Sequence, residues 1–366
     1  MKLKWACTLV GVTGVVTACS FGPIRASSTA APTTGISQLA RDGATLSPGS
    51  IGSAGPVVGV NLYALHNYSP REAVTYGTRT LGYIRNDLHA DAVDLVWNLY
   101  TPSYTSDLVV TKNAETLTAS DIGTLTRIAQ RDGLLVEYRP IMFVETRENP
   151  WEGLIEPASP DAWFDSYYQA NLPYLEMAQR YRVNEYVIGT EMNLIGSDPQ
   201  WASFLSRSAK VFTGQITYAA SDNLYFPPST QLPPTALTGM DMYERLRLPA
   251  SASLSEVVAA YDKFFAGAPA PLLERTAIQE TGIEARAGAY RQTPNLGMPG
   301  ILDEAVQYDW FMAGCEAVGR FHLRGIFFWK VDLADNPVHH PASSLSTFEG
   351  KSGATAISKC ASIIKD

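Results

Sequence analysis

The 366-residue sequence has few cysteines, few histidines and no excess of positive charge, and each of these features argues against a class of protein. Its four cysteines show none of the paired spacing of a zinc site. Its five histidines are scattered apart from His339 and His340, which lack a third ligand in register and read as solvated loop residues. The formal net charge of −8 argues against nucleic acid as a partner. We therefore expect no metal, no cofactor and no nucleic acid.

The sequence also lacks an apolar run long enough to cross a bilayer, which takes about 20 residues. Lys2 and Lys4 precede a shorter apolar run, Trp5–Thr17, which is the pattern of a secretory signal. The stretch Val16-Thr17-Ala18-Cys19 resembles the lipobox of bacterial lipoproteins. That resemblance implies cleavage before Cys19, lipidation of its thiol and a membrane anchor in the cell envelope. An ordinary secretory signal that ends near Cys19 is the alternative.

Composition divides the chain into three segments. Residues 1–18 form the expected signal peptide, and residues 19–55, dominated by Ser, Thr, Ala, Gly and Pro, read as a flexible tether. Residues 56–366 are enough for one large domain, because barrels of alternating strands and helices use about this length as a single unit.

From Pro56 onward, strand-like runs alternate with amphipathic helical stretches. The strand-like runs are Val57–Leu62, Ala92–Leu99, Leu134–Phe143, Glu185–Thr190, Gln215–Ala220, Thr238–Tyr243, Thr276–Glu280 and Gly325–Trp329. Helical stretches are expected at Arg71–Arg85, Ala119–Asp132, Asp161–Arg182, Trp201–Phe212, Leu254–Phe265, Asp303–Arg320 and Ser352–Ile364.

This alternation predicts parallel strands joined by helical crossovers. An open doubly wound sheet would begin with a glycine-rich phosphate loop, which Asn61-Leu62-Tyr63 is not. The predicted fold is therefore α/β, a single (β/α)8 TIM barrel, in which function gathers at the carboxyl ends of the strands.

Two cysteines remain in the barrel once Cys7 is removed with the signal and Cys19 is lipidated. Cys315 and Cys360 fall in the last two expected helices, and an exported pair could form a disulfide. The sequence does not give the distance between them, so the pairing stays open.

Two expected strands end in a glutamate. Glu191 follows Val187–Thr190, and Glu280 follows Ala277–Gln279. Glycoside cleavage needs one carboxylic acid and one carboxylate, which lie about 5–5.5 Å apart in retaining enzymes. A glutamate at the end of one strand is more often a helix cap or the partner of an arginine. Two glutamates that face each other across one barrel mouth predict catalysis.

The sequence Ile188-Gly189-Thr190-Glu191 resembles the Ile-Gly-Thr-Glu of glycoside hydrolase family 113. Further similarity to that family lies in Leu134–Pro140, Trp151–Ile155, Gly239–Tyr243 and Gln279–Ile283. The resemblance implies a retaining endo-β-1,4-mannanase with Glu191 as acid/base and Glu280 as nucleophile. The chain departs from the family at Arg139, where lysine is commoner, and at Ile141, where a histidine follows the strand's proline.

Residues near the strand ends are candidates for binding the sugar. Trp329 is expected to form the floor under the scissile sugar, and any of the others could instead belong to the core. These others are Asn61, Trp97, Asn98, Trp151 and Tyr243. Three roles are open for Arg139: it contacts the sugar, it pairs with a catalytic acid, or it forms an ion pair inside the barrel. Asp241 and Glu244 are rival acids for partnership with Glu191.

Two other functions remain open. A surface lipoprotein could bind glycan without cutting it, although both glutamates are retained. A transglycosylase acting on a cell-wall polymer would use the same two glutamates, with a sugar hydroxyl in place of water. In each case the expected partners are a polysaccharide or oligosaccharide and a membrane, and the protein is expected to be a monomer.

Overall fold

The computed structural model describes residues 49–146, 151–222, 233–243, 246, 248–291, 298–339 and 344–364. Within these residues, eight strands form a closed parallel barrel in which each strand pairs with the next and β1 pairs with β8. They are β1 (Val57–Ala64), β2 (Ala92–Thr101), β3 (Leu135–Val144), β4 (Glu185–Thr190), β5 (Gln215–Ser221), β6 (Thr238–Met242), β7 (Thr276–Thr281) and β8 (Gly325–Asp332). The predicted (β/α)8 barrel is confirmed.

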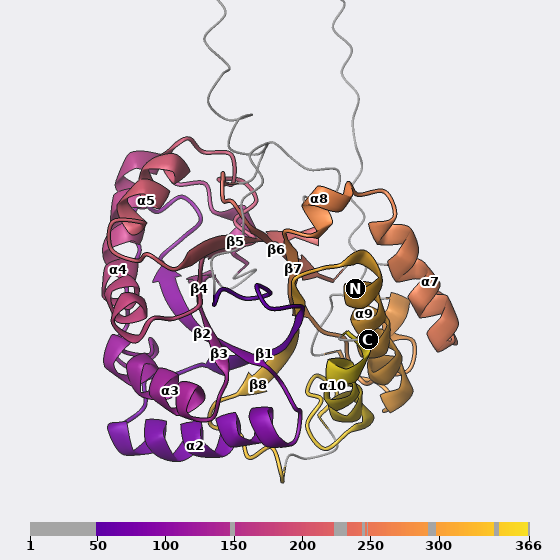
Figure 1. The fold of residues 1–366 in the computed structure, drawn as a ribbon. Helices are drawn as coiled ribbons and strands as arrows, with labels where there is room; N and C mark the ends of the chain where they lie inside the picture. Colours follow the sequence, from indigo (N-terminus) through magenta and orange to yellow (C-terminus); the bar gives the residue numbers. More distant parts are fainter. Residues whose placement is uncertain are drawn as a thin grey trace, which may run out of the picture. The chain divides into compact units, whose positions relative to one another are not determined.

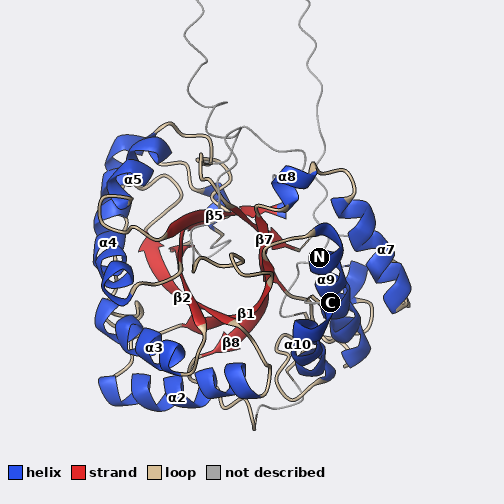
Figure 2. Cartoon of the chain, in the orientation of Figure 1, coloured by secondary structure: helices blue, strands red, loops and turns tan. Residues whose placement is uncertain are grey.

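Helices surround the ring of strands (Figures 1 and 2). The larger ones are α2 (Pro70–Asn86), α3 (Ala119–Arg131), α4 (Pro160–Tyr181), α5 (Gln200–Ser208), α7 (Leu254–Phe265), α9 (Glu304–Phe321) and α10 (Ser352–Ile363). Short helices are η1 (Glu152–Leu154), α8 (Ala270–Leu273) and η2 (Ala289–Arg291). Local sequence fixes where some of them begin, because Ser69 and Glu72 form a capping box at the start of α2.

The barrel interior is polar as well as apolar. Gln279 of β7 is fully buried, and its amide nitrogen donates to the Glu137 carboxylate of β3 at 3.0 Å. Gly239 of β6 makes room for it, since a Cβ at that position would lie 1.5 Å from the Gln279 amide oxygen. Polar side chains therefore fill the barrel beneath the edge where the strands end.

The predicted tether, residues 19–55, extends too far along the chain. Residues 49–55 pack against the N-terminal edge of the barrel, where Ile51 is fully buried beside Val57 and Phe327. The Arg324 guanidinium also donates to the Ile51 carbonyl oxygen at 2.9 Å. The buried isoleucine and the Arg324 hydrogen bond together hold a segment that is otherwise rich in glycine and serine. The signal peptide, Cys19 and the rest of the tether lie outside the described residues.

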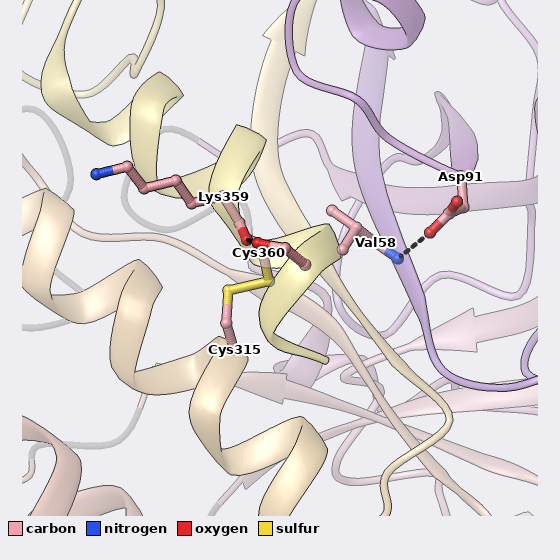
Figure 3. Close-up of a disulfide and its surroundings, with 6 residues drawn as sticks. Val58, Asp91, Cys315, Lys359 and Cys360 are labelled. Carbon is pink, nitrogen blue, oxygen red and sulfur yellow. Dashed lines mark hydrogen bonds between the residues drawn. A yellow bond between two sulfur atoms is a disulfide. The ribbon is translucent and has the colours of Figure 1, made fainter. Parts of the chain in front are cut away.

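A disulfide joins the last two large helices (Figure 3). Cys315 of α9 and Cys360 of α10 are fully buried, with 5.5 Å between their Cα atoms. The bond connects the helices that flank β8 in the sequence. Among the residues that the structure describes, none of the helices is both long and apolar enough to cross a membrane.

Candidate active site

Glu191 and Glu280 lie at the carboxyl ends of β4 and β7, on the edge of the barrel where catalytic groups gather. Glu191 has a φ of 47°, in the left-handed region that costs a residue other than glycine about 1–3 kcal/mol. Its backbone N–H donates to the Ala219 carbonyl oxygen of β5 at 2.9 Å. The neighbouring strand therefore stabilises the unusual backbone turn that presents Glu191.

The Glu191 carboxylate accepts a hydrogen bond from an indole. Trp151 Nε1 donates to Glu191 Oε2 at 2.8 Å, and Trp151 directly precedes η1. A Cβ on Gly153 would lie 2.4 Å from the Trp151 ring, so glycine is needed for the indole to pack there. The Leu194 N–H donates to the Gly153 carbonyl at 3.3 Å, which ties η1 to the loop after Glu191.

The Glu280 carboxylate has a different set of partners. Arg139 Nη1 donates to Glu280 Oε1 at 2.8 Å, and the Tyr243 hydroxyl donates to Glu280 Oε2 at 3.1 Å. Both carboxylate oxygens are therefore held, one of them by a fixed positive charge. Glu280 is 6% exposed, which leaves it a narrow opening to the barrel mouth.

The two glutamates differ in the charge of their direct partners. Burial raises the pKa of Glu191, and the hydrogen bond from the Trp151 indole opposes that rise. Burial also raises the pKa of Glu280, to about 8, opposed first by the Arg139 charge, and the nearby Glu191 raises it further. The direct partner of Glu280 is a cation while that of Glu191 is neutral, so these contacts favour the ionised form of Glu280 more than that of Glu191.

Aromatic and amide side chains of β1, β2 and β8 contact one another toward the carboxyl ends of these strands. Trp329 of β8 is half-buried, and its ring centroid lies 5.5 Å from that of Tyr63 on β1. The Tyr63 hydroxyl donates to Asn98 Oδ1 at 2.5 Å. Partly exposed rings beside directed polar groups are what a site needs to hold a sugar ring and its hydroxyls.

Comparisons with known proteins identify the family. The sequence model of Glycoside Hydrolase Family 113 matches residues 75–346, which is more than half of the chain. This chain belongs to glycoside hydrolase family 113. It is therefore a glycoside hydrolase. The comparison with curated proteins found no match.

Solved structures share the fold of this family 113 hydrolase. The family 113 β-mannanase from Alicyclobacillus acidocaldarius, in complex with ManMIm, is 16% identical with a TM-score of 0.69, over 86% of this chain and 100% of that one. An exo-β-1,4-mannosidase from Opitutaceae bacterium strain TAV5 is 12% identical with a TM-score of 0.51, over 88% of this chain and 63% of that one.

Three of the predicted sugar contacts are buried inside this hydrolase, and one of them, Arg139, instead pairs with Glu280. Asn61, Trp97 and Arg139 are all fully buried, which argues against direct contact between their side chains and a sugar. Trp97 stacks on Tyr174 of α4 with 4.5 Å between ring centroids, in the layer between barrel and helices. Its neighbour Asn98 faces the opposite side of β2, because successive side chains of a strand alternate.

The remaining predicted residues gather at the edge of the barrel where the strands end. Trp151 and Tyr243 contact the two glutamates, while Asn98 and Trp329 both adjoin Tyr63. The rival acid Asp241 is fully buried, with Oδ1 3.2 Å from Arg139 Nη1. Glu244 lies outside the described residues. Within the described ranges, no group of three His, Cys, Asp or Glu side chains is placed to hold a metal ion.

Sequence reasoning missed two buried acids near the site. Asp94 of β2 pairs with Arg139, and Glu152 of η1 lies beside Trp151 with 8% exposure. Burial raises the pKa of Glu152 well above its ordinary value, and the nearby Glu191 raises it further. The signal for Asp94 was a charged residue inside an apolar strand-like run.

We expect the Glu152→Gln variant to become more stable relative to wild type as the pH rises from about 5 to about 8. The raised pKa means that folded Glu152 holds its proton where the unfolded chain, with a glutamate pKa near 4.3, has lost it. The wild type therefore loses stability as the pH rises through this window, and glutamine removes that loss. Denaturant unfolding of both proteins across the window measures the difference. A difference independent of pH would contradict this assignment.

Proposed function

We propose that this family 113 hydrolase cleaves a β-1,4-linked mannan with retention of anomeric configuration, acting within the polymer. The family assignment supports glycoside hydrolysis, and the similarity to a solved family 113 β-mannanase supports a mannan-like substrate. The single observation that carries the mechanism is the contrast between the two glutamates. Glu280 is paired with a cation, and Glu191 with a neutral donor.

In the first step, ionised Glu280 attacks the anomeric carbon while protonated Glu191 gives its proton to the leaving glycosidic oxygen. This forms a covalent glycosyl ester on Glu280 and releases the aglycone part of the chain. Arg139 and Tyr243 hold the attacking carboxylate in one orientation. Formation of the ester cancels the negative charge of Glu280.

In the second step, Glu191 is ionised and removes a proton from water, which attacks the same anomeric carbon and breaks the ester. Loss of the negative charge on Glu280 makes it easier for Glu191 to ionise after the first step. Two displacements at one carbon give net retention.

The test is hydrolysis of mannan, glucomannan, xylan and β-glucan by residues 49–366. Starting at residue 49 keeps the segment that packs under the barrel. We expect mannan and glucomannan to be shortened rapidly in mean chain length, since an enzyme that cuts within the polymer lowers viscosity before it releases much sugar. Cleavage of xylan or β-glucan alone would contradict the substrate, and release of single sugars from chain ends would contradict internal cleavage.

The same assay separates the two rival functions. A transglycosylase would give products longer than the substrate, because a sugar hydroxyl replaces water in the second step. A protein that only binds glycan would leave every polymer intact and still bind one of them. Both glutamates and their separate partners support turnover over binding alone.

We also propose that the protein is exported and anchored to the cell envelope through a lipid on Cys19. The lysines at the start, the apolar run and the Val-Thr-Ala-Cys stretch support this. The Cys315–Cys360 disulfide supports export, because such bonds persist in oxidising compartments. Mass spectrometry of the mature N-terminus should find an acylated cysteine as residue one, and Cys19→Ala should abolish membrane association. An unmodified N-terminus would overturn the anchor.

A further inference from the structure

Asp94 is a fully buried acid that the proposed reaction does not use directly. It is the third residue of β2, inside the barrel, and its Oδ2 contacts Arg139 Nε at 2.6 Å. The same oxygen accepts a hydrogen bond from Asn61 Nδ2 at 2.8 Å. Burying a charged group costs free energy, so a buried acid with directed partners points to a role in stability or function.

Each nitrogen of the Arg139 guanidinium has its own partner. Nε forms an ion pair with Asp94, Nη1 donates to the catalytic Glu280 and to Asp241, and Nη2 donates to the Gln279 carbonyl oxygen at 2.9 Å. The guanidinium is planar and rigid, so fixing Nε also fixes the direction of the other two nitrogens. Lysine, a single point charge, could not make this set of contacts.

Asn61 closes the set of contacts into a ring. Its Nδ2 lies 2.8 Å from Asp94 Oδ2 and 3.2 Å from the Gln279 carbonyl oxygen. Gln279 is the residue directly before Glu280, so Asp94 is connected to the nucleophile both through Arg139 and through the backbone of β7.

We propose that Asp94 is a positioning residue for the nucleophile, holding the Arg139 guanidinium so that Nη1 stays directed at the Glu280 carboxylate. The inference rests on the proposed role of Glu280. It assigns a function to an acid that touches neither the substrate nor the reacting atoms.

Charge gives the role a measurable consequence. The charged and titratable groups around Glu280 are Arg139, Tyr243, Glu191, Glu152 and Asp241. Those around Asp94 are Arg139, Glu137 and Glu185. Asp94 and Glu280 share the positive charge of Arg139, so removing the Asp94 charge leaves more of it to stabilise ionised Glu280. The nucleophile should then ionise at a lower pH.

The test compares Asp94→Asn and Asp94→Ala with wild type on a soluble mannan-derived oligosaccharide, with kcat, KM and full pH profiles. We expect kcat to fall about tenfold in the asparagine variant and about a hundredfold in the alanine variant, with KM changed less than about twofold, because a small misplacement of a reacting group has effects of this size. The acid limb of kcat/KM should move to lower pH in Asp94→Asn.

Asp91→Asn is the matched control. Asp91 comes just before β2, where its Oδ2 accepts from the Val58 N–H at 3.2 Å (Figure 3). It receives the same chemical change at the N-terminal edge of the barrel, opposite the edge that carries Glu280, and the activity and pH profile of this variant should match those of wild type.

Unchanged kcat and acid limb in folded Asp94→Asn would overturn the proposal, and so would a change in KM alone. If neither Asp94 variant folds, Asn61→Ala removes the second contact of Asp94 Oδ2 and should lower kcat several-fold at constant KM; unchanged kcat there would also overturn it. The wild type and Glu280→Gln are run in the same assay, so that failure of the Asp94 proposal can be told apart from failure of the proposed function. Equal activity of those two proteins would refute the role of Glu280 itself.

Discussion

Replacing Glu280 by alanine should lower the rate of mannan hydrolysis by a factor on the order of 10⁴ or more, because the variant cannot form the covalent intermediate. Glu280 has both oxygens held by Arg139 and Tyr243, and the fall should appear in kcat with little change in KM. Steady-state kinetics on mannan-derived oligosaccharides measure it. Glu274→Gln, an exposed acid just before β7, should retain full activity.

The stereochemistry of chemical rescue makes this prediction specific to a nucleophile. Azide can enter the space left by the missing carboxylate and attack the anomeric carbon of an activated β-mannoside directly. A single displacement inverts the configuration, so the product should be the α-glycosyl azide. A β-glycosyl azide from Glu280→Ala would show that a nucleophile other than Glu280 forms the intermediate.

Replacing Glu191 by alanine should have a large effect that depends on the leaving group. On mannan, whose leaving oxygen needs a proton, the rate should fall by about 10²–10⁴, the usual contribution of general acid–base catalysis. A dinitrophenyl leaving group needs no proton, so kcat/KM for that substrate should stay within about tenfold of wild type. The kcat should fall, because no base activates water in the second step.

Azide gives the complementary result for this variant. Glu280 still forms the covalent intermediate, and azide then displaces it without needing a base, so two displacements yield the β-glycosyl azide. The exposed Glu176 of α4 supplies the control variant Glu176→Gln, which should behave as wild type. An α-glycosyl azide from Glu191→Ala would mean that the two roles are reversed.

The strands of the barrel could be predicted because their apolar and β-branched runs are separated by helical stretches of regular length. The polar interior was missed for a related reason. Asp94 and Gln279 sit inside strands that were read only as apolar runs, although acids or amides at inward positions indicate a buried polar layer. The side-chain alternation of β2 also shows that Trp97 and Asn98 cannot both face the mouth.

Contacts between distant loops could not be predicted from the sequence. The Trp151–Glu191 hydrogen bond joins residues 40 positions apart, and it depends on how η1 packs after β3. Ile51 was assigned to the tether because a single apolar residue among glycines and serines gives no periodic pattern. Its burial becomes apparent only when the N-terminal edge of the closed barrel is formed.

The most direct test of the account is to trap the intermediate with an activated 2-deoxy-2-fluoro mannobioside and locate the label by peptide mass spectrometry. Fluorine at C2 slows both the formation and the hydrolysis of the glycosyl ester. The good leaving group restores the rate of formation alone, so the ester should accumulate. The account predicts one sugar label, on the Glu280 carboxylate in the β7 peptide, with time-dependent loss of activity. A label on Asp241, Glu152 or Glu191, or mannan hydrolysis by an enzyme that never becomes labelled, would contradict it.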